Sequence, residues 1–426
     1  METTYRGMII DFDYQGHGVT KLDNATVFLD GGMIGDQVEY IVTKKKRNFL
    51  KGRIIEILKP SSDRIPSPCP YSSTCGGCDF LEYPYEKELL WKQNLVKNNM
   101  KRIGEIEGDV QKIVPSTEIF HYRNHMQFQV KGKQVGLFSK NSRTITEIDT
   151  CLMQSPNGNK VLKIMKEWKK IHHLDRIGIR SNQKDEILLI LVSKKSVPKL
   201  NSILPDLLEA GVISIYENIN PSNRHHYSKN FHKIFGKDLL TEKLGSYSYR
   251  LSPQSFFQIN RQMTEKLYQV ALDQLDLDHQ DLVYDLYSGI GTISLKAAQG
   301  AGKVIGIEIE EQAVENARDN AVRNGITNTR FIAGAAEEGI IQLKEQEDLT
   351  PNAVIVDPPR GGLDPSLVQF LTDHPVEKIL YISCNPATQA RDIKMWKGHY
   401  KVERIIPVDM FPRTAHVECV VLLSRE

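Results

Sequence analysis

The sequence predicts an α/β protein with a doubly wound, Rossmann-like C-terminal domain, a central α+β domain and an N-terminal β-barrel. From about residue 246 onward, apolar strand-like segments alternate with helix-like segments, the pattern of a parallel sheet covered on both faces. Residues 1–60 are instead short strand-like segments separated by glycine-rich turns. A chain of 426 residues is too long for one compact core. We therefore expect three domains, over residues 1–60, 61–245 and 246–426.

Composition limits the kind of partner. The net charge is only +2, so any nucleic-acid surface must be local rather than spread over the whole chain. No apolar run is long enough to span a membrane, and the first residues (METTYRGMII) lack the pattern of a signal peptide. We expect a cytoplasmic protein with no membrane association, and we infer no obligate protein partner.

The N-terminal segment reads as a small barrel of the OB type, a fold that commonly binds nucleic acid. The basic run Lys44–Arg53 contains an aromatic residue, Phe49. Such a mixture suits contacts with phosphates and stacking on bases. The alternative is a hairpin tip exposed to solvent.

Three closely spaced cysteines follow a Pro/Ser-rich linker over residues 60–70. Cys69, Cys75 and Cys78 have the spacing C-x(5)-C-x(2)-C, and the next cysteine is Cys151. Six cysteines in a chain of this size do not suggest a secreted disulfide framework. Three clustered thiolates plus a remote one fit a four-cysteine iron–sulfur cluster better than a zinc site, which usually shows two paired motifs. Zinc remains the alternative, and four unligated cysteines a weaker one.

The central part begins with a helical pattern over residues 83–102, which ends in a basic turn and which we expect to pack on the C-terminal domain. Mixed strand-like and helix-like segments follow to residue 245. Arg123 lies in a polar break, HYRNH, between strand-like pieces. It is either a surface charge or a substrate contact.

A strand, a glycine turn and a helix are predicted around Asp285–Thr292. Gly289 and Gly291 allow a ligand to approach the backbone, but Ser294 stands where a dinucleotide fingerprint needs its third glycine. Glu308 ends the next strand, where nucleoside cofactors have their ribose hydroxyls held. An acid without a phosphate-binding lysine suits a nucleoside without a polyphosphate, and S-adenosylmethionine is the natural candidate. The alternative is a purely structural turn.

A buried strand ends at YISCNPATQARD, and a helix is predicted to start there. Asn385 can cap this helix and Pro386 suits its first turn. We expect the helix N-terminus to lower the pKa of the Cys384 thiol and make it a nucleophile. The alternative is a buried structural cysteine.

Two carboxylates are candidates for further roles. Asp357 closes the strand AVIVD, and the two prolines after it fix a turn that aims the side chain into the cleft; the alternative is a helix-capping Asp. Glu418 stands in an apolar strand, where a carboxylate is costly unless paired or functional. It is therefore a candidate general base, unless it faces solvent on an edge strand. We expect His416 and Cys419 to be packing or orienting groups.

The motifs SCNPATQARD, DPPR, FPRTAHVE, DLYSGIGTIS and QSFFQIN together resemble the RNA uracil-5-methyltransferases of the RumA/TrmA type. The cysteine spacing with Cys151 is similar to the 4Fe-4S site of the rRNA-modifying members, and the N-terminal barrel is similar to their TRAM domain. Related tRNA enzymes generally lack both regions, so the resemblance implies that 23S rRNA is the substrate and partner.

The resemblance also implies roles for individual residues. Cys384 would add to carbon 6 of uracil, and Glu418 would remove the proton from carbon 5. The target base would have to be flipped out of its stack. Alternatives are the same reaction on tRNA, or an inactive RNA-binding assembly factor. The other implied site residues are Asp357 at the cofactor or the uracil edge, Gln258, Tyr287, Gly289 and Glu308 at the cofactor, Arg123 at the uracil, and Cys69, Cys75, Cys78 and Cys151 at the cluster.

Overall fold

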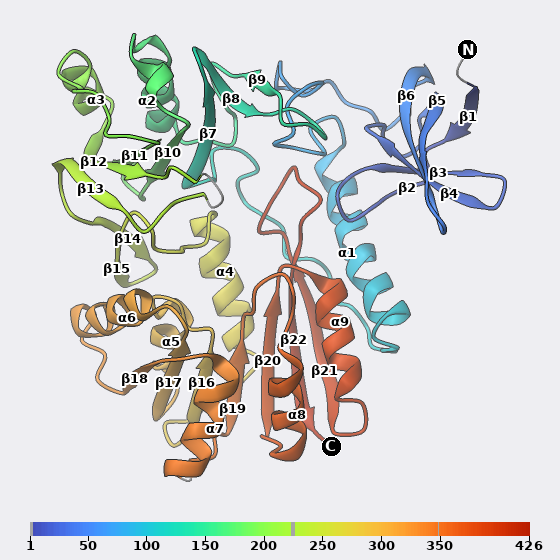
Figure 1. Cartoon of the computed structure of the whole chain (residues 1–426). Coiled ribbons are helices and arrows are strands. Elements are labelled where there is room, and N and C mark those ends of the chain that lie inside the picture. Colours follow the sequence, from blue (N-terminus) through green and yellow to red (C-terminus); the bar gives the residue numbers. More distant parts are fainter. Residues whose placement is uncertain (1–2, 223–225, 348) are drawn as a thin grey trace.

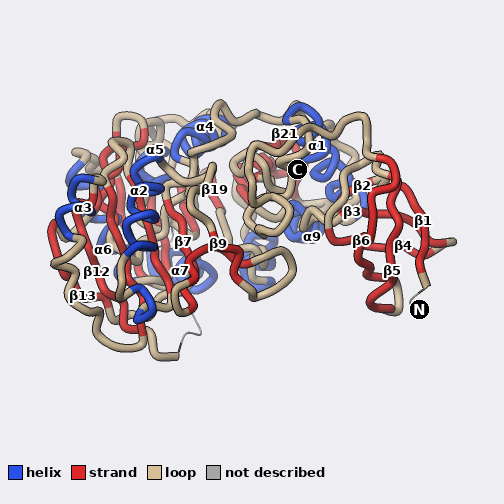
Figure 2. The backbone as a smooth tube through the Cα atoms, turned by 90° about the horizontal axis from the view of Figure 1, so that it is seen from above, coloured by secondary structure: helices blue, strands red, loops and turns tan. Residues whose placement is uncertain are grey.

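The computed structural model describes residues 3–222, 226–347 and 349–426. Within these residues the strands form three larger sheets and one two-stranded sheet. The N-terminal sheet and the central sheet lie toward opposite ends of the molecule (Figures 1 and 2).

The N-terminal strands close into the predicted barrel. Their order is β1-β5-β6-β4-β3-β2, and β4 and β6 pair in parallel. β1 and β2 are two parts of one interrupted strand: β1 pairs with β5 and β2 pairs with β3, so this strand joins both ends of the sheet. This is the arrangement of an OB-type barrel. The strands are β1 (Thr4–Met8), β2 (Asp11–Phe12), β3 (Gly18–Leu22), β4 (Ala25–Asp30), β5 (Gln37–Lys45) and β6 (Leu50–Lys59).

The central sheet has the order β13-β12-β11-β10-β7-β8-β9, with two helices and a 3-10 turn in the same part of the chain. Helix α2 (Pro156–Glu167) begins where the Ser155 hydroxyl accepts a hydrogen bond from the Gly158 N–H, with proline in its first turn. The remaining elements are β7 (His125–Lys131), β8 (Gln134–Phe138), β9 (Ile145–Glu147), η1 (Ile171–His173), β10 (Arg176–Ser181), β11 (Ile187–Ser193), α3 (Leu204–Glu209), β12 (Val212–Ile219) and β13 (Phe231–Gly236).

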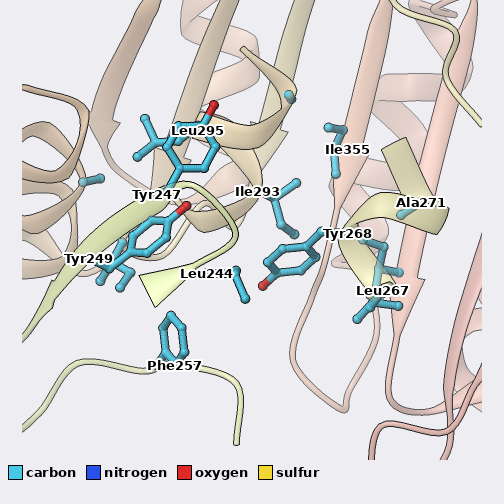
Figure 3. Packing of buried hydrophobic residues seen from close by; sticks show 14 of the residues in the cluster. Leu244, Tyr247, Tyr249, Phe257, Leu267, Tyr268, Ala271, Ile293, Leu295 and Ile355 are labelled. Atoms are coloured by element: carbon cyan, nitrogen blue, oxygen red, sulfur yellow. The ribbon is translucent and has the colours of Figure 1, made fainter. Parts of the chain in front are cut away.

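A hairpin and a helix connect the central sheet to the C-terminal sheet. They are β14 (Leu240–Leu244), β15 (Tyr247–Leu251) and α4 (Arg261–Leu272). Their apolar side chains belong to one buried cluster that contains Leu188 and Ile190 of β11 and also Val283 and Ile355 of the C-terminal sheet. Figure 3 shows Tyr249, Phe257, Tyr268 and Ile293 within this cluster. The two sheets are therefore joined by a continuous core.

The C-terminal sheet has the order β18-β17-β16-β19-β20-β22-β21. The first five strands are parallel, and β22 is antiparallel to both of its neighbours. The C-terminal ends of the parallel strands and the first residue of β22 therefore meet at one edge. The elements are β16 (Leu282–Leu286), α5 (Thr292–Ala297), β17 (Lys303–Glu308), α6 (Glu311–Arg323), β18 (Thr329–Ala333), α7 (Ala336–Glu347), β19 (Ala353–Val356), α8 (Pro365–Asp373), β20 (Lys378–Ser383), α9 (Pro386–Met395), β21 (Tyr400–Val408) and β22 (Glu418–Arg425).

Helix α1 (Tyr85–Arg102) packs beside α9 and β21 although about 280 residues separate α1 from α9. Val96 and Met100 of α1 share a buried cluster with Ala390 and Ile393 of α9. Figure 1 shows α1 beside α9. We propose domains over residues 1–60, 61–245 and 246–426, with α1 added to the C-terminal layer. The last boundary falls in the turn of the β14–β15 hairpin, which connects the two domains. None of the described helices is long and apolar enough to cross a membrane.

Candidate active site

The edge at which the C-terminal strands end carries a cavity of about 1990 Å³. Glu308 ends β17, Asp357 follows β19, Cys384 follows β20 and Glu418 begins β22. All four side chains line this cavity, as do Gln258, Tyr287 and Gly289. The sequence thus predicted residues that the fold brings together at the strand ends, the usual ligand position in an open α/β sheet.

One side of the cavity is built by the turn after β16. The Glu308 carboxylate accepts hydrogen bonds from the backbone N–H groups of Gly289 and Glu310, both at 2.9 Å. Gly289 has a φ of 54° and Tyr287 a φ of 131°, conformations that residues with side chains rarely adopt. No atom lies within 4 Å of a Cβ built on Gly289. Backbone conformation rather than space therefore favours glycine here.

Two further carboxyl groups interact with each other near this turn, Asp285 of β16 and Asp357 after β19. Burial raises the pKa of Asp285 to about 7, and the Ser294 hydroxyl, 2.5 Å from its Oδ2, opposes this shift. Burial also raises the pKa of Asp357 to about 7, and the neighbouring Asp285 adds to it. With Glu308, these groups give the cavity an acidic side that suits a cationic ligand.

Cys384 stands at the predicted strand-to-helix junction. The Asn385 side chain caps α9 by accepting a hydrogen bond from the Ala387 N–H at 3.2 Å, and Pro386 is the first helical residue, as expected. The expected low thiol pKa is wrong. Burial, with a smaller effect of Glu418, raises the pKa of Cys384 to about 11. The helix N-terminus does not outweigh the loss of water around the half-buried thiol.

Arg360 lies at the same site, although no role was predicted for it from the sequence. One of its guanidinium nitrogens is 3.3 Å from His416 Nε2. Its carbonyl oxygen accepts hydrogen bonds from Asn385 Nδ2 at 3.0 Å and Thr388 Oγ1 at 3.4 Å. Its positive charge lowers the pKa of Cys384 and opposes the rise at Glu418. Its position in DPPR, directly after the Asp357 turn, is the signal that could have identified it.

Glu418 is 3 % exposed and lines the cavity. Strand β22 lies between β20 and β21, so the alternative of an edge strand facing solvent is wrong. Burial raises the pKa of Glu418 well above its usual range, and Asp357 adds to the shift. Once ionised, such a carboxylate is a stronger base than an exposed glutamate.

Comparison with known proteins identifies the family. The family model for tRNA (uracil-5-)-methyltransferases matches residues 84–426. The chain belongs to this family. An RNA methyltransferase of Clostridium tetani is 35 % identical over 99 % of this chain and 96 % of its own length. An RNA methyltransferase of Staphylococcus aureus strain MSSA476 is 36 % identical over 98 % of this chain and 97 % of its own length.

A solved structure is similar over nearly the whole chain. It is the tRNA (uracil-54, C5)-methyltransferase of Pyrococcus abyssi in complex with S-adenosyl-L-homocysteine. The two chains are 26 % identical, with a TM-score of 0.79, and the match covers 98 % of this chain and 100 % of the other. The chain is thus an RNA methyltransferase of the uracil-5 family, with the expected fold class.

Within this methyltransferase, Arg123 does not line the cavity as far as the described residues show. Its backbone N–H donates to the Met153 carbonyl at 3.0 Å. Its guanidinium interacts with Tyr122, Cys78 and Cys151, which raise the pKa of Arg123 against the opposing effect of burial. Arg123 therefore lies beside Cys78 and Cys151, and its predicted contact with the substrate stays a prediction.

Cys69, Cys75, Cys78 and Cys151 come together in space. All four are partly buried free thiols, and the thiols of Cys75 and Cys151 each interact with that of Cys69. Burial raises the pKa of Cys75, Cys78 and Cys151. Among the residues that the structure describes, no three His, Cys, Asp or Glu side chains are close enough to hold a metal ion. The electrostatic interactions of the four thiols show that they are neighbours, but within the described part of the chain their arrangement does not show a metal site.

Proposed function

We propose that this methyltransferase transfers the methyl group of S-adenosylmethionine to carbon 5 of a uridine in 23S rRNA. The reaction proceeds through a covalent bond between Cys384 and carbon 6. The observation that carries the proposal is that Cys384, Glu418, Asp357 and Glu308 line one cavity at the strand ends.

S-adenosylmethionine suits the acidic side of this cavity. Its sulfonium is a cation, and the carboxyl groups of Asp357 and Glu308 favour positive charge beside them. Glu308, held by the Gly289 N–H, is an acceptor for a ribose hydroxyl pair. We assign Gln258, Tyr287 and Gly289 to the same ligand because they line the same cavity. The similar Pyrococcus enzyme, which holds S-adenosyl-L-homocysteine, supports this assignment.

The chemistry follows from the weak nucleophilicity of carbon 5 in uracil. The Cys384 thiolate adds to carbon 6, and electrons move onto the ring as an enolate. Carbon 5 then takes the methyl group, and S-adenosylhomocysteine leaves. The Glu418 carboxylate removes the proton from carbon 5. The bond between sulfur and carbon 6 breaks, the ring double bond returns and the thiolate leaves.

Arg360 assists this sequence as the positive charge beside the nucleophile. Because the pKa of Cys384 is about 11, most of the thiol is protonated at neutral pH. The guanidinium stabilises the thiolate that does form. It also keeps Glu418 more acidic than burial alone would, so that the carboxylate is available as a base.

The RNA substrate reaches this cavity as an extruded base. We assign the N-terminal barrel, with the basic run Lys44–Arg53, to the RNA backbone around the target. Arg123 would support the RNA from the cysteine side of the site. We propose the cytoplasm as the location of the protein.

We propose a 4Fe-4S cluster on Cys69, Cys75, Cys78 and Cys151, supported by their electrostatic interactions in the folded chain. Such a cluster would fix the 69–78 segment to Cys151. Methyl transfer moves no net electrons, so we assign the cluster a structural or RNA-positioning role. The cluster and the barrel are the basis for proposing 23S rRNA.

A tRNA is the second candidate substrate. The similar Pyrococcus structure is a tRNA enzyme, and the match covers the barrel and cysteine regions as well. Separate assays with tRNA and 23S rRNA transcripts distinguish the two substrates.

The test of the chemistry is a covalent trap. RNA with 5-fluorouridine at the target has no carbon-5 proton to lose, so the wild-type protein should remain bound to it after methyl transfer. Cys384→Ala should form no such adduct and should not methylate ordinary RNA. Methylation of RNA by Cys384→Ala would refute the covalent route. So would a wild-type protein that methylates an ordinary RNA but forms no adduct with the 5-fluorouridine form of the same RNA. An inactive assembly factor would methylate neither RNA.

A further inference from the structure

A buried charged side chain connects α1 to the loop that leads into Glu418. The ammonium group of Lys92 is fully buried and contacts three acceptors. These are Glu88 Oε1 at 2.7 Å, Asp409 Oδ1 at 2.6 Å and the carbonyl oxygen of Phe411 at 3.1 Å. All three protons of the ammonium group can therefore be donated inside the protein. Two of the three acceptors belong to the connection between β21 and β22.

The same connection is held at Arg413. This residue has a φ of 69°, a left-handed conformation that is strained for a residue with a side chain. Its backbone N–H donates to Glu88 Oε1 at 2.8 Å, and its guanidinium donates to the Tyr83 carbonyl at 2.8 Å. The strained backbone is thus fixed from outside the sheet, by α1 and the residues just before it.

The segment after the cysteines adds to these contacts. The Asp79 N–H donates to the Arg413 carbonyl, and Asp79 Oδ2 accepts from the Ala415 N–H, both at 2.9 Å. Tyr85 donates its hydroxyl proton to Asp409 Oδ2 at 2.6 Å. Residues 79–92 therefore fix the loop at Asp409, Phe411, Arg413 and Ala415.

This loop is part of the site. In Figure 1 the connection between β21 and β22 rises from the sheet toward the N-terminal end of α1. Phe411 lines the cavity, and Glu418 follows the loop directly as the first residue of β22. A shift of the loop would move the carboxylate that takes the carbon-5 proton.

A gain in stability is a weak explanation for the buried ionic group of Lys92, Glu88 and Asp409. Removing ions from water costs free energy that their attraction recovers only in part, and apolar residues of similar size often stabilise a fold equally well. A buried network does fix one geometry, because each member accepts few alternatives.

We propose that Lys92, with Glu88, Asp409 and Arg413, positions the 409–417 loop so that Glu418 can remove the carbon-5 proton. Lys92 is a positioning residue, since it contacts the loop and is not among the described residues that line the cavity. This inference rests on the proposed function, in which Glu418 is the base.

The test separates proton removal from the steps before it. Full-length Lys92→Met, Lys87→Met and Glu418→Gln are each given RNA and radiolabelled S-adenosylmethionine for one turnover. The methylated covalent adduct is then measured on a denaturing gel. Lys87 is the matched control, because it lies on the same helix but pairs with Asp63 at the surface. Binding of S-adenosylhomocysteine and circular dichroism measure whether each variant is folded.

We expect both Glu418→Gln and Lys92→Met to accumulate the methylated adduct. In Lys92→Met the amount should be about tenfold that of wild type, because a small misplacement of a catalytic group costs on the order of 10–100-fold in rate. Lys87→Met should match wild type. If Lys92→Met is folded and shows the wild-type amount of adduct while Glu418→Gln accumulates adduct, the positioning role of Lys92 is overturned and the proposed base is not. Absence of adduct with Glu418→Gln overturns the proposed base. If Lys92→Met does not fold, Tyr85→Phe is read in the same way, since it removes the hydroxyl that donates to Asp409 and accepts from the Ser116 N–H.

Discussion

Cys384 and Glu418 each lie next to the same pair of facing residues, Ser383 of β20 and Cys419 of β22. Cys384 follows Ser383, and Glu418 precedes Cys419. Residues that face each other across an antiparallel ladder project to the same side of the sheet. The register of β20 and β22 therefore sets the position of the proposed nucleophile relative to the proposed base. In the proposed reaction the base is carried by a strand that is antiparallel to both of its neighbours.

The rate of methylation should rise with pH across the neutral range. The proposed reaction uses ionised Cys384 and ionised Glu418, and burial raises the pKa of both groups, to about 11 for the thiol. Single-turnover rates at saturating S-adenosylmethionine should increase between about pH 6 and pH 9. A rate that is constant or falls over this range would show that neither ionisation limits the reaction.

Arg360→Gln should make the Cys384 thiol less reactive even without RNA. Loss of the positive charge raises the pKa of the thiol further, because Arg360 lowers it in the wild type. Alkylation of Cys384 by iodoacetamide at pH 8 should slow by about tenfold if the pKa rises by about one unit. Peptide mass spectrometry measures the rate at this cysteine. Arg323→Gln, an exposed arginine at the end of α6, is the control, and equal rates for both variants would refute the effect.

Glu308→Gln should weaken binding of S-adenosylhomocysteine. The substitution keeps the size of the side chain but removes the negative charge that accepts from the Gly289 and Glu310 N–H groups. Hydrogen bonds to a charged group are worth about 1.5–3 kcal/mol, so the affinity should fall by roughly 10–100-fold. Titration calorimetry measures the change. Glu345→Gln, an exposed residue of α7, should bind as wild type, and unchanged binding by Glu308→Gln would exclude Glu308 from the cofactor site.

Cys151→Ser should remove iron from the protein if the four cysteines hold a cluster. We expect the wild-type chain, purified without oxygen, to contain iron and acid-labile sulfide and to absorb visible light. Cys384→Ser should keep the iron and the sulfide, because Cys384 lies at the cavity and is not one of the four proposed ligands. A wild-type protein with zinc in place of iron and sulfide would support the alternative metal. Equal iron content in wild type and Cys151→Ser would contradict the ligand assignment.

The features that were predicted correctly are those that depend on residues close together in the sequence. The Asn385 cap, the turn at Gly289 and the acid at the end of β17 depend on neighbouring residues, and all three were predicted correctly. The pKa of Cys384 was not, because burial by the rest of the domain outweighs the helix end. Lys92 is an ordinary helical lysine in the sequence. Its role depends on Asp409, more than 300 residues away, and no pattern in one sequence reveals that contact.

The early position of α1 in the chain has a consequence for biosynthesis. This helix leaves the ribosome long before α9 and β21, against which Val96 and Met100 pack. Until those partners are translated, its apolar face has no permanent cover and its Lys92–Glu88 pair has no Asp409. The packing of α1 in the native protein can therefore be completed only after the C-terminal strands have been translated.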